Sequence, residues 1–173
     1  MIQRLRVPLG FAVALPVLFY LAKPSSSSIL IGLPIAVSGV VFRGLAAGFI
    51  KKNSVLATTG PYAWTRNPLY FGTFLLIVGF AVMCANLYAA VLLGAAFMLV
   101  YPRVIRKEEA ELERIFGDEF RVYASQVPRF FPRPRRFQGS FSMAQYIANR
   151  EYNASLGLLG AVAILVLKLR GVF

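Results

Sequence analysis

Histidine is absent from the 173-residue chain, and cysteine occurs only once, as Cys84. Without histidine the chain has no His-ligated metal site, no Ser-His triad and no histidine general base. With a single cysteine it cannot form a disulfide within the chain. We therefore predict no metal site, and we interpret Cys84 as a small packing residue.

Charged residues are also scarce, at 15% of the chain against about 25% in an average soluble domain. Acids are the scarcest: 7 Asp and Glu stand against 19 Lys and Arg, for a net charge of +12. Hydrophobic residues make up 58%, and the mean hydropathy is +0.64. This composition excludes an ordinary soluble fold and predicts an all-α, polytopic membrane protein with a single domain over 1–173. In a membrane protein such a basic excess indicates cytoplasmic loops and anionic lipid, so we predict no nucleic-acid partner.

Five apolar runs predict five membrane spans. Only Ala85-Asn86 separates the third run from the fourth, which predicts a tight antiparallel hairpin. The first run holds only 16 residues, slightly short of the roughly 20 that a spanning helix needs. A signal peptide with Arg4 and Arg6 as its basic region is the alternative for that run. The predicted spans are 7–22, 29–50, 69–84, 87–101 and 154–167.

The distribution of basic residues predicts the orientation. With the N-terminus in the cytoplasm, the basic residues of 1–6, 51–66 and 103–136 all lie inside, and only three basic residues face out. The opposite orientation would place most of the charge outside, against the positive-inside rule. We therefore predict a cytoplasmic N-terminus and an external C-terminus. Simple loops and the lack of a retention signal favour a prokaryotic inner membrane.

Arg43 is a lone charge within the predicted span 29–50. A charge inside a span usually faces a cavity or a partner, which would place Arg43 near a functional site. Alternatively, its long side chain snorkels to the inner surface beside Lys51-Lys52. The sequence leaves both interpretations open.

The first segment that does not behave like membrane is 51–68. Gly60-Pro61 and Asn67-Pro68 are turn signals. Pro68 suits the first turn of the next helix, so we expect Asn67 to cap the third span at its cytoplasmic end. Backbone N–H groups at a helix start favour a carboxylate or phosphate.

The second such segment, 103–136, holds six of the seven acids. Leu112, Ile115 and Phe116 recur at helical spacing, which predicts an amphipathic helix ended by Gly117. The acids could form an ordinary solvated face, or they could receive a cationic or hydroxyl-rich ligand at the cytoplasmic mouth. Beyond them, prolines, arginines and phenylalanines over 127–136 indicate an interfacial segment at anionic headgroups.

These two segments carry an ordered set of residues that resembles the isoprenylcysteine carboxyl methyltransferase and phospholipid methyltransferase superfamily. That family shows a G-x-Y, R-H-P-x-Y-x-G stretch, a hairpin of spans, and then E-E-x-x-L, F-G-x-x-Y and P. The resemblance covers roughly 50–132. The matching positions are Gly60, Tyr62, Arg66, Pro68, Tyr70, Gly72, Glu108, Glu109, Leu112, Phe116, Gly117, Tyr123 and Pro128.

The resemblance implies an integral membrane methyltransferase that uses S-adenosylmethionine and releases S-adenosylhomocysteine. It implies a cofactor pocket on the cytoplasmic side and a membrane lipid or lipidated substrate that enters from the bilayer. Arg66, Tyr70 and Glu108 are the implied catalytic residues. The implied cofactor-binding residues are Leu56, Gly60, Tyr62, Arg66, Asn67, Pro68, Tyr70, Glu108 and Glu109, and we add Arg129 as the residue that closes the pocket.

Simple chemistry is compatible with these roles. Arg66 and the start of the third span can hold the cofactor carboxylate. Glu108 or Glu109 can accept hydrogen bonds from the ribose hydroxyls or the ammonium. Tyr62 and Tyr70 can pack on the adenine or the sulfonium. Because the transfer is an in-line displacement, alignment and desolvation should supply most of the catalysis.

One position departs from the family pattern, because Asn67 stands where the family has histidine. Asparagine can donate and accept hydrogen bonds, but it cannot take a proton at neutral pH. An amine acceptor would then need help from a glutamate, whereas a carboxylate or thiolate needs no base. Two alternatives remain: an NADPH-dependent reductase relative, or a membrane protein that binds lipid without catalysis.

Overall fold

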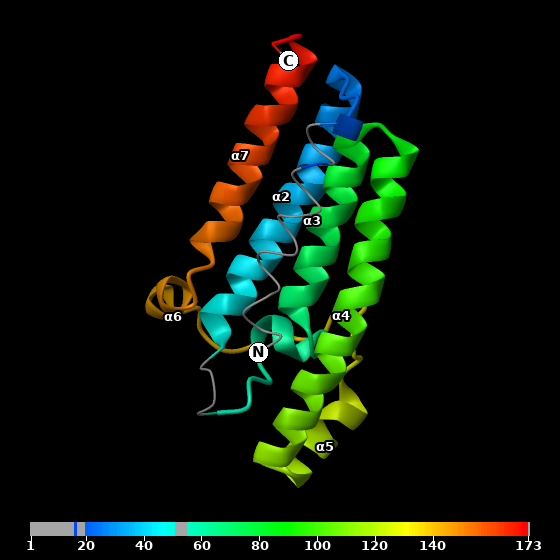
Figure 1. Ribbon diagram of the computed structural model, residues 1–173. Coiled ribbons are helices and arrows are strands. Elements are labelled where there is room, and N and C mark those ends of the chain that lie inside the picture. The colour runs from blue at the N-terminus through cyan, green and yellow to red at the C-terminus, as the bar shows by residue number, and fades with distance from the viewer. Residues whose placement is uncertain (1–15, 17–19, 51–54, 173) are drawn as a thin grey trace.

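The computed structural model describes residue 16, residues 20–50 and residues 55–172, and every regular element in this part of the chain is a helix (Figure 1). The predicted all-α class is therefore confirmed. Four apolar helices run side by side, and a shorter helical region lies at one end of them. The elements are α2 (Ser26–Phe49), the 3-10 helix η2 (Gly60–Ala63), α3 (Pro68–Cys84), α4 (Leu87–Phe116), α5 (Asp118–Gln126), α6 (Met143–Ala148) and α7 (Tyr152–Leu169).

Three of these helices, α2, α4 and α7, are long and apolar enough to cross a membrane, and α3 is a shorter apolar helix. They coincide with four of the predicted spans. The first predicted span, 7–22, lies almost wholly outside the described residues, so the total of five remains a prediction. These helices support an integral membrane protein, and the orientation of the termini stays a prediction.

Glycines allow α2 and α3 to pack in direct backbone contact. A Cβ added to Gly79 would lie 2.5 Å from the backbone nitrogen of Ala36, and one added to Gly39 would lie 2.6 Å from the carbonyl oxygen of Gly72. Small residues commonly allow helices to approach closely in lipid, where the hydrophobic effect does not drive helices together. This pair forms the rigid centre of the bundle.

The predicted hairpin between α3 and α4 is present. Ala85 ends α3 in the left-handed conformation, with φ of 46°. Asn86 then caps α4, because its side chain accepts a hydrogen bond from the Ala89 N–H at 3.1 Å. The two-residue connection forces the helices to lie antiparallel.

The membrane span and the amphipathic helix expected after it form one continuous helix, α4, of 30 residues. Pro102 lies inside this helix and does not end it. A helix of this length measures about 45 Å, which exceeds the roughly 30 Å of a hydrocarbon core. Its last turns therefore extend beyond the other helices (Figure 1). Gly117, with φ of 53°, ends it as predicted.

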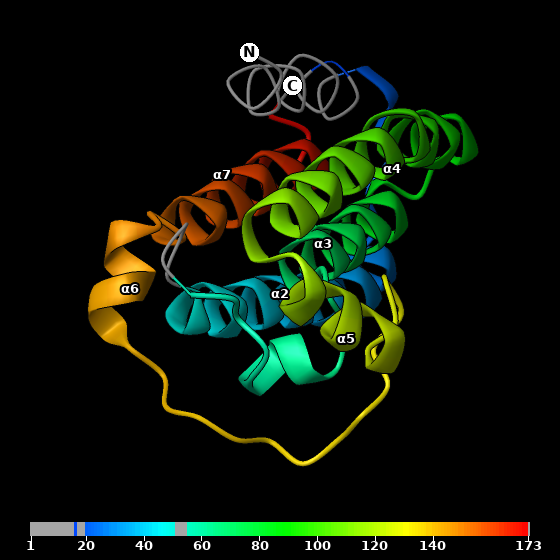
Figure 2. The same ribbon diagram turned by 90° about the horizontal axis from the view of Figure 1, so that it is seen from below.

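The segment between α5 and α6 forms a strap around the outside of the bundle (Figure 2). Backbone hydrogen bonds attach it to the loop before α3: Arg133 N–H donates to the Trp64 carbonyl at 2.9 Å, and Gly60 N–H donates to the Gln138 carbonyl at 2.9 Å. The strap thereby holds residues 60–64 beside the end of α2 and the start of α3.

Arg43 pairs with Glu151, and this resolves the two interpretations of the lone charge. Arg43 Nε donates to Glu151 Oε2 at 3.0 Å, and Nη1 donates to the Thr73 hydroxyl. Glu151 directly precedes α7. Arg43 therefore does not snorkel to the surface; it connects α2 and α3 to the start of α7.

Candidate cofactor site at the ends of α3 and α4

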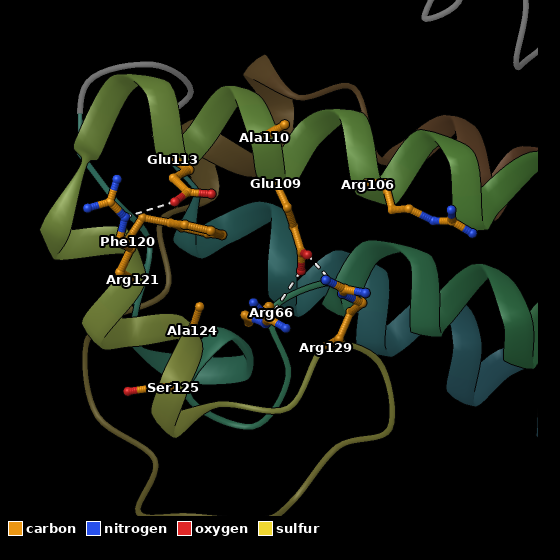
Figure 3. A pocket seen from close by; sticks show the side chains of 10 residues that line it. All are labelled: Arg66, Arg106, Glu109, Ala110, Glu113, Phe120, Arg121, Ala124, Ser125 and Arg129. Carbon is orange, nitrogen blue, oxygen red and sulfur yellow. Dashed lines mark hydrogen bonds and ion pairs between the residues drawn. The ribbon is translucent and has the colours of Figure 1, made fainter.

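Glu109 lies at the centre of the site, with only 6% of its surface exposed. Asn67 Nδ2 donates to its Oε1 at 3.1 Å, and Arg129 Nε donates to its Oε2 at 2.8 Å. Arg66 Nε lies 3.4 Å from Oε1, an ion pair that lacks hydrogen-bond geometry. These three side chains come from two separate segments and meet on one buried carboxylate. Figure 3 shows two of them, Arg66 and Arg129, beside Glu109.

Further hydrogen bonds join the loop before α3 to the segment after α5. The Thr65 hydroxyl donates to the Phe130 carbonyl at 2.9 Å, and Asn67 Nδ2 donates to the Arg129 carbonyl at 2.9 Å. Arg66 N–H donates to the Pro128 carbonyl at 2.9 Å. Buried polar groups need such partners, so the two loops act as one unit.

Asn67 takes the predicted N-cap position of α3, but the expected side-chain cap is absent. The Asn67 amide instead donates to Glu109 and to the Arg129 carbonyl. The charge-assisted hydrogen bond to the buried carboxylate is strong, so it orients the Asn67 amide toward Glu109.

A cavity of about 500 Å³ adjoins this cluster, and α4 and α5 form most of its wall (Figure 3). Its lining has four arginines against two glutamates. Phe120 and Ala124 of α5 provide an apolar portion. The lining residues are Arg66, Arg106, Glu109, Ala110, Glu113, Phe120, Arg121, Ala124, Ser125 and Arg129.

Most acids of the 103–136 segment are already paired with arginine. Glu111 pairs with Arg114 at 2.6 Å, and Arg121 pairs with both Glu113 and Asp118. Both side chains of each pair are largely exposed, so these acids form an ordinary solvated face, one of the two interpretations of the acids in this segment. Since four arginines and two glutamates line the cavity, its lining favours a ligand that carries an anionic group.

The two buried tyrosines beside the site support the loop that precedes α3. Tyr123 donates its hydroxyl to the Tyr62 carbonyl at 2.8 Å. The Tyr62 hydroxyl is buried and has no hydrogen-bond partner among the described residues. Burial raises the pKa of both phenols well above the usual value. Both side chains are therefore neutral at physiological pH.

The structure brings together four of the predicted site residues: Arg66, Asn67, Glu109 and Arg129. The others lie around the cluster and do not line the cavity. Leu56 packs against Phe120, Tyr123 and Val127, and Tyr70 makes an edge contact with Tyr101 at 5.4 Å. The remaining predicted positions outside the cavity are Gly60, Tyr62, Pro68 and Glu108.

Helix α5 supplies part of the cavity wall, which was not predicted from the sequence. Phe120, Arg121, Ala124 and Ser125 reach the cavity at helical spacing. That spacing was a usable signal, since positions 120, 121, 124 and 125 share one helical face. Thr65 was also missed, and nothing in the sequence distinguishes it from an ordinary loop threonine.

Comparison with known proteins assigns the class. The family model described as phospholipid methyltransferase matches residues 27–119, which is more than half of the chain. The chain therefore belongs to the phospholipid methyltransferase family, as the resemblance predicted. The matched region runs from α2 to the start of α5 and includes Arg66, Asn67 and Glu109.

Individual relatives fall into two groups. The chain is 40% identical over 103 residues to the nickel-cobalt-cadmium resistance protein NccN of Alcaligenes xylosoxydans xylosoxydans, covering 60% of this chain and 48% of the relative. It is 30% identical over 95 residues to the protein-S-isoprenylcysteine O-methyltransferase of Schizosaccharomyces pombe, covering 55% of this chain and 40% of the relative. The chain thus spans about half the length of the curated relatives it matches. No solved structure matches it.

Proposed function

We propose that this protein is a membrane-embedded methyltransferase that transfers a methyl group from S-adenosylmethionine to a lipophilic acceptor at the cytoplasmic face. One observation carries the proposal: the two segments with the family residues meet on the buried Glu109 beside a cavity of about 500 Å³. The protein-S-isoprenylcysteine O-methyltransferase relatives support lipophilic chemistry.

The cavity lining fits S-adenosylmethionine in size and chemistry. Small-molecule sites typically measure about 300–1,000 Å³, and this cavity falls within that range. Arg66, Arg106 and Arg129 would hold the carboxylate. Glu113 would accept hydrogen bonds from the ammonium or the ribose hydroxyls, and Phe120 offers an apolar face for the adenine.

The cofactor would supply an electrophilic methyl group, and the residues of this chain would orient and desolvate the reactants. The acceptor atom forms a bond to the methyl carbon while the carbon–sulfur bond breaks, and the sulfur keeps the electron pair. Asn67 cannot take a proton. We propose Glu108 as the group that takes the proton from an amine substrate, with Arg66 and Tyr70 as the other catalytic residues. Glu108 and Tyr70 lie beside the cavity and not in its lining, so the methyl acceptor would bind on their side of Arg66.

Glu109 is better suited to hold the site together than to contact the cofactor. Both of its oxygens are already engaged by Asn67, Arg66 and Arg129. Four other predicted residues would support the loop before α3 without lining the cavity: Leu56, Gly60, Tyr62 and Pro68. These residues thus stay in the proposed site, but as residues that position it and do not contact the cofactor.

Calorimetry of S-adenosylhomocysteine binding to the detergent-purified protein tests the proposal. Arg106 and Lys107 are adjacent and exposed on α4, but only Arg106 lines the cavity. We expect Arg106→Gln to weaken binding about tenfold, as the loss of one charge-assisted hydrogen bond would. Lys107→Gln is the matched control and should bind as the wild type does.

A screen with labelled S-adenosylmethionine and lipid extracts would then identify the acceptor. A folded wild-type protein that binds no S-adenosylhomocysteine would refute the methyltransferase proposal. The interpretation as a lipid-binding protein without catalysis would then take its place.

A further inference from the structure

The strap between α5 and α6, residues 127–142, carries three exposed arginines that are not neutralised by an acid of the described chain. Arg133, Arg135 and Arg136 are exposed, and none of them takes part in the ion pairs of the described residues. The seven acids of the chain all lie outside the strap, at 108–119 and at 151. A counter-charge for these arginines would therefore have to come from another molecule.

Hydrogen bonds fix the backbone of the strap, so its arginines extend from a defined line. Trp64 Nε1 donates to the Arg135 carbonyl at 2.8 Å, and Arg133 N–H donates to the Trp64 carbonyl at 2.9 Å. Near the other end, Ser142 N–H donates to the Gly48 carbonyl at 3.0 Å. The strap is thus attached to the loop before α3 and to the last turn of α2.

Phenylalanines on both sides of these arginines pack against the apolar helices. Phe131 makes an edge contact with Phe74 of α3, with ring centroids 6.4 Å apart, and it is still 69% exposed. Phe141 covers Gly48 of α2, because a Cβ added at Gly48 would overlap the Phe141 ring. Helix α2 is long and apolar enough to cross a membrane, and α3 is a shorter apolar helix. Exposed rings beside such helices are typical of the membrane interface.

The helix ends set the depth of the arginines between these rings. Phe74 lies about two turns into α3, and Gly48 lies beside the last residue of α2. The strap passes around the bundle between these two points (Figure 2). In a bilayer, the ends of apolar helices meet the polar headgroup layer. The three arginines therefore lie at the level of lipid phosphates.

Charge and surroundings together favour a bilayer lipid over a soluble polyanion. Guanidinium groups bind phosphate oxygens through paired, charge-assisted hydrogen bonds, and basic clusters next to a span attract anionic lipids. A nucleic acid could also pair with the arginines. However, Phe131 and Phe141 lie beside an apolar helix surface, which a bilayer covers and a nucleic acid does not. Only the bilayer satisfies the charges and the rings at once.

We propose that the strap is a docking surface for anionic phospholipid headgroups, with Arg133, Arg135 and Arg136 on the phosphates and the phenylalanines in the interface. The proposal is independent of the methyltransferase activity, because it depends only on the charge, exposure and packing of the strap. It assigns to this segment a preference for one class of lipid.

Trp64 provides the measurement, because it is the only tryptophan of the chain and its ring lies 5.5 Å from that of Phe137 in the strap. The full chain is placed in nanodiscs of phosphatidylcholine that contain a small, fixed fraction of dibrominated lipid. The brominated lipid is either phosphatidylglycerol or phosphatidylcholine, and bromine quenches a nearby tryptophan. We expect phosphatidylglycerol to be enriched about fivefold around Trp64, the scale that one basic residue contributes at a charged surface.

The triple variant Arg133→Gln, Arg135→Gln, Arg136→Gln should be quenched equally by the two brominated lipids. The wild-type comparison stands by itself even if this variant does not fold, because it changes only the lipid.

The matched control removes the same charge at the opposite end of the bundle (Figure 1). It changes Lys23, Lys168 and Arg170 to glutamine. Lys23 N–H donates to the carbonyl of Cys84, the last residue of α3, and Lys168 and Arg170 lie at the end of α7. This control should keep the enrichment of the wild type.

Equal quenching of the wild type by the two brominated lipids would overturn the proposal. A folded triple variant that keeps the wild-type enrichment would also overturn it. If soluble glycerol 3-phosphate at the headgroup concentration removes the enrichment, the arginines bind free phosphate, and docking to a bilayer is refuted.

Discussion

Glu108 and Glu109 are neighbours in sequence but differ in their surroundings. Successive residues of a helix point about 100° apart, so only one of them can face the arginine cluster. Glu109 is buried against Asn67 and Arg129. Glu108 is half-buried on an adjacent face, where its charge contributes to the raised pKa of Tyr62. The sequence identified the pair but could not choose between them, because the choice depends on the rotation of α4.

The buried tyrosines predict a loss of stability at alkaline pH. Burial raises the pKa of Tyr62 and Tyr123 above the ordinary value near 10. In the unfolded chain both phenols ionise above about pH 10, whereas in the folded chain they stay protonated. The stabilising contribution is therefore complete below pH 10 and declines as the pH rises further.

Thermal unfolding of the detergent-solubilised protein between pH 8 and 11 measures this decline. The Tyr62→Phe, Tyr123→Phe double variant should lose less stability than the wild type over this range. Tyr88→Phe, an exposed tyrosine at the start of α4, is the control and should follow the wild type. A double variant with an unchanged pH profile would contradict the prediction.

At the scale of the helices, the contact between α2 and α3 should tolerate no added atoms. A methyl group at Gly79 would lie 2.5 Å from the Ala36 nitrogen and 2.7 Å from the Gly32 carbonyl oxygen. Because these are backbone atoms, the helices would have to separate. We expect Gly79→Ala to destabilise the protein by about 1–3 kcal/mol in thermal unfolding.

The control for this prediction is Gly157→Ala on α7, where an added Cβ meets nothing within 4 Å. That change should leave stability unchanged or raise it slightly, since alanine favours helix over glycine. Equal effects of the two substitutions would show that close packing does not explain Gly79.

The helices were predictable where local signals decide them. The hairpin at Ala85-Asn86 follows from a two-residue break between apolar runs, and the end of α4 follows from Gly117. Pro102 lies inside α4 without ending it. A proline removes only one N–H and bends a helix, and the residues on both sides of it still favour helix strongly enough to continue. The site was harder to predict, because Thr65 and α5 join it only through the tertiary arrangement.

At the scale of the whole molecule, α7 is attached to the rest of the chain differently from the other helices. The family model ends at residue 119, so α7 lies outside the matched region. Most of its surface is exposed in the described structure, including Leu156 and Leu159. Within the described residues, one polar attachment at the start of α7 is the pair between Glu151 and Arg43, whose side chains are only 11% and 22% exposed.

This pair should therefore be strongly coupled. Removing one partner leaves the other charge buried without compensation, which typically costs about 3–5 kcal/mol. We expect Arg43→Met and Glu151→Gln each to lower the unfolding temperature sharply. The double variant should lose little more than either single variant, because it leaves no buried charge behind.

The exposed pair between Arg114 and Glu111 provides the matched comparison, with side chains 74% and 55% exposed. Surface pairs of this kind contribute about 0–1 kcal/mol. Double-mutant cycles on both pairs measure their coupling energies. If the coupling of Arg43 with Glu151 is as small as that of Arg114 with Glu111, this ion pair does not hold α7 in place. A large coupling would mean that this ion pair fixes the start of α7 against α2, beside the loop that carries Tyr62.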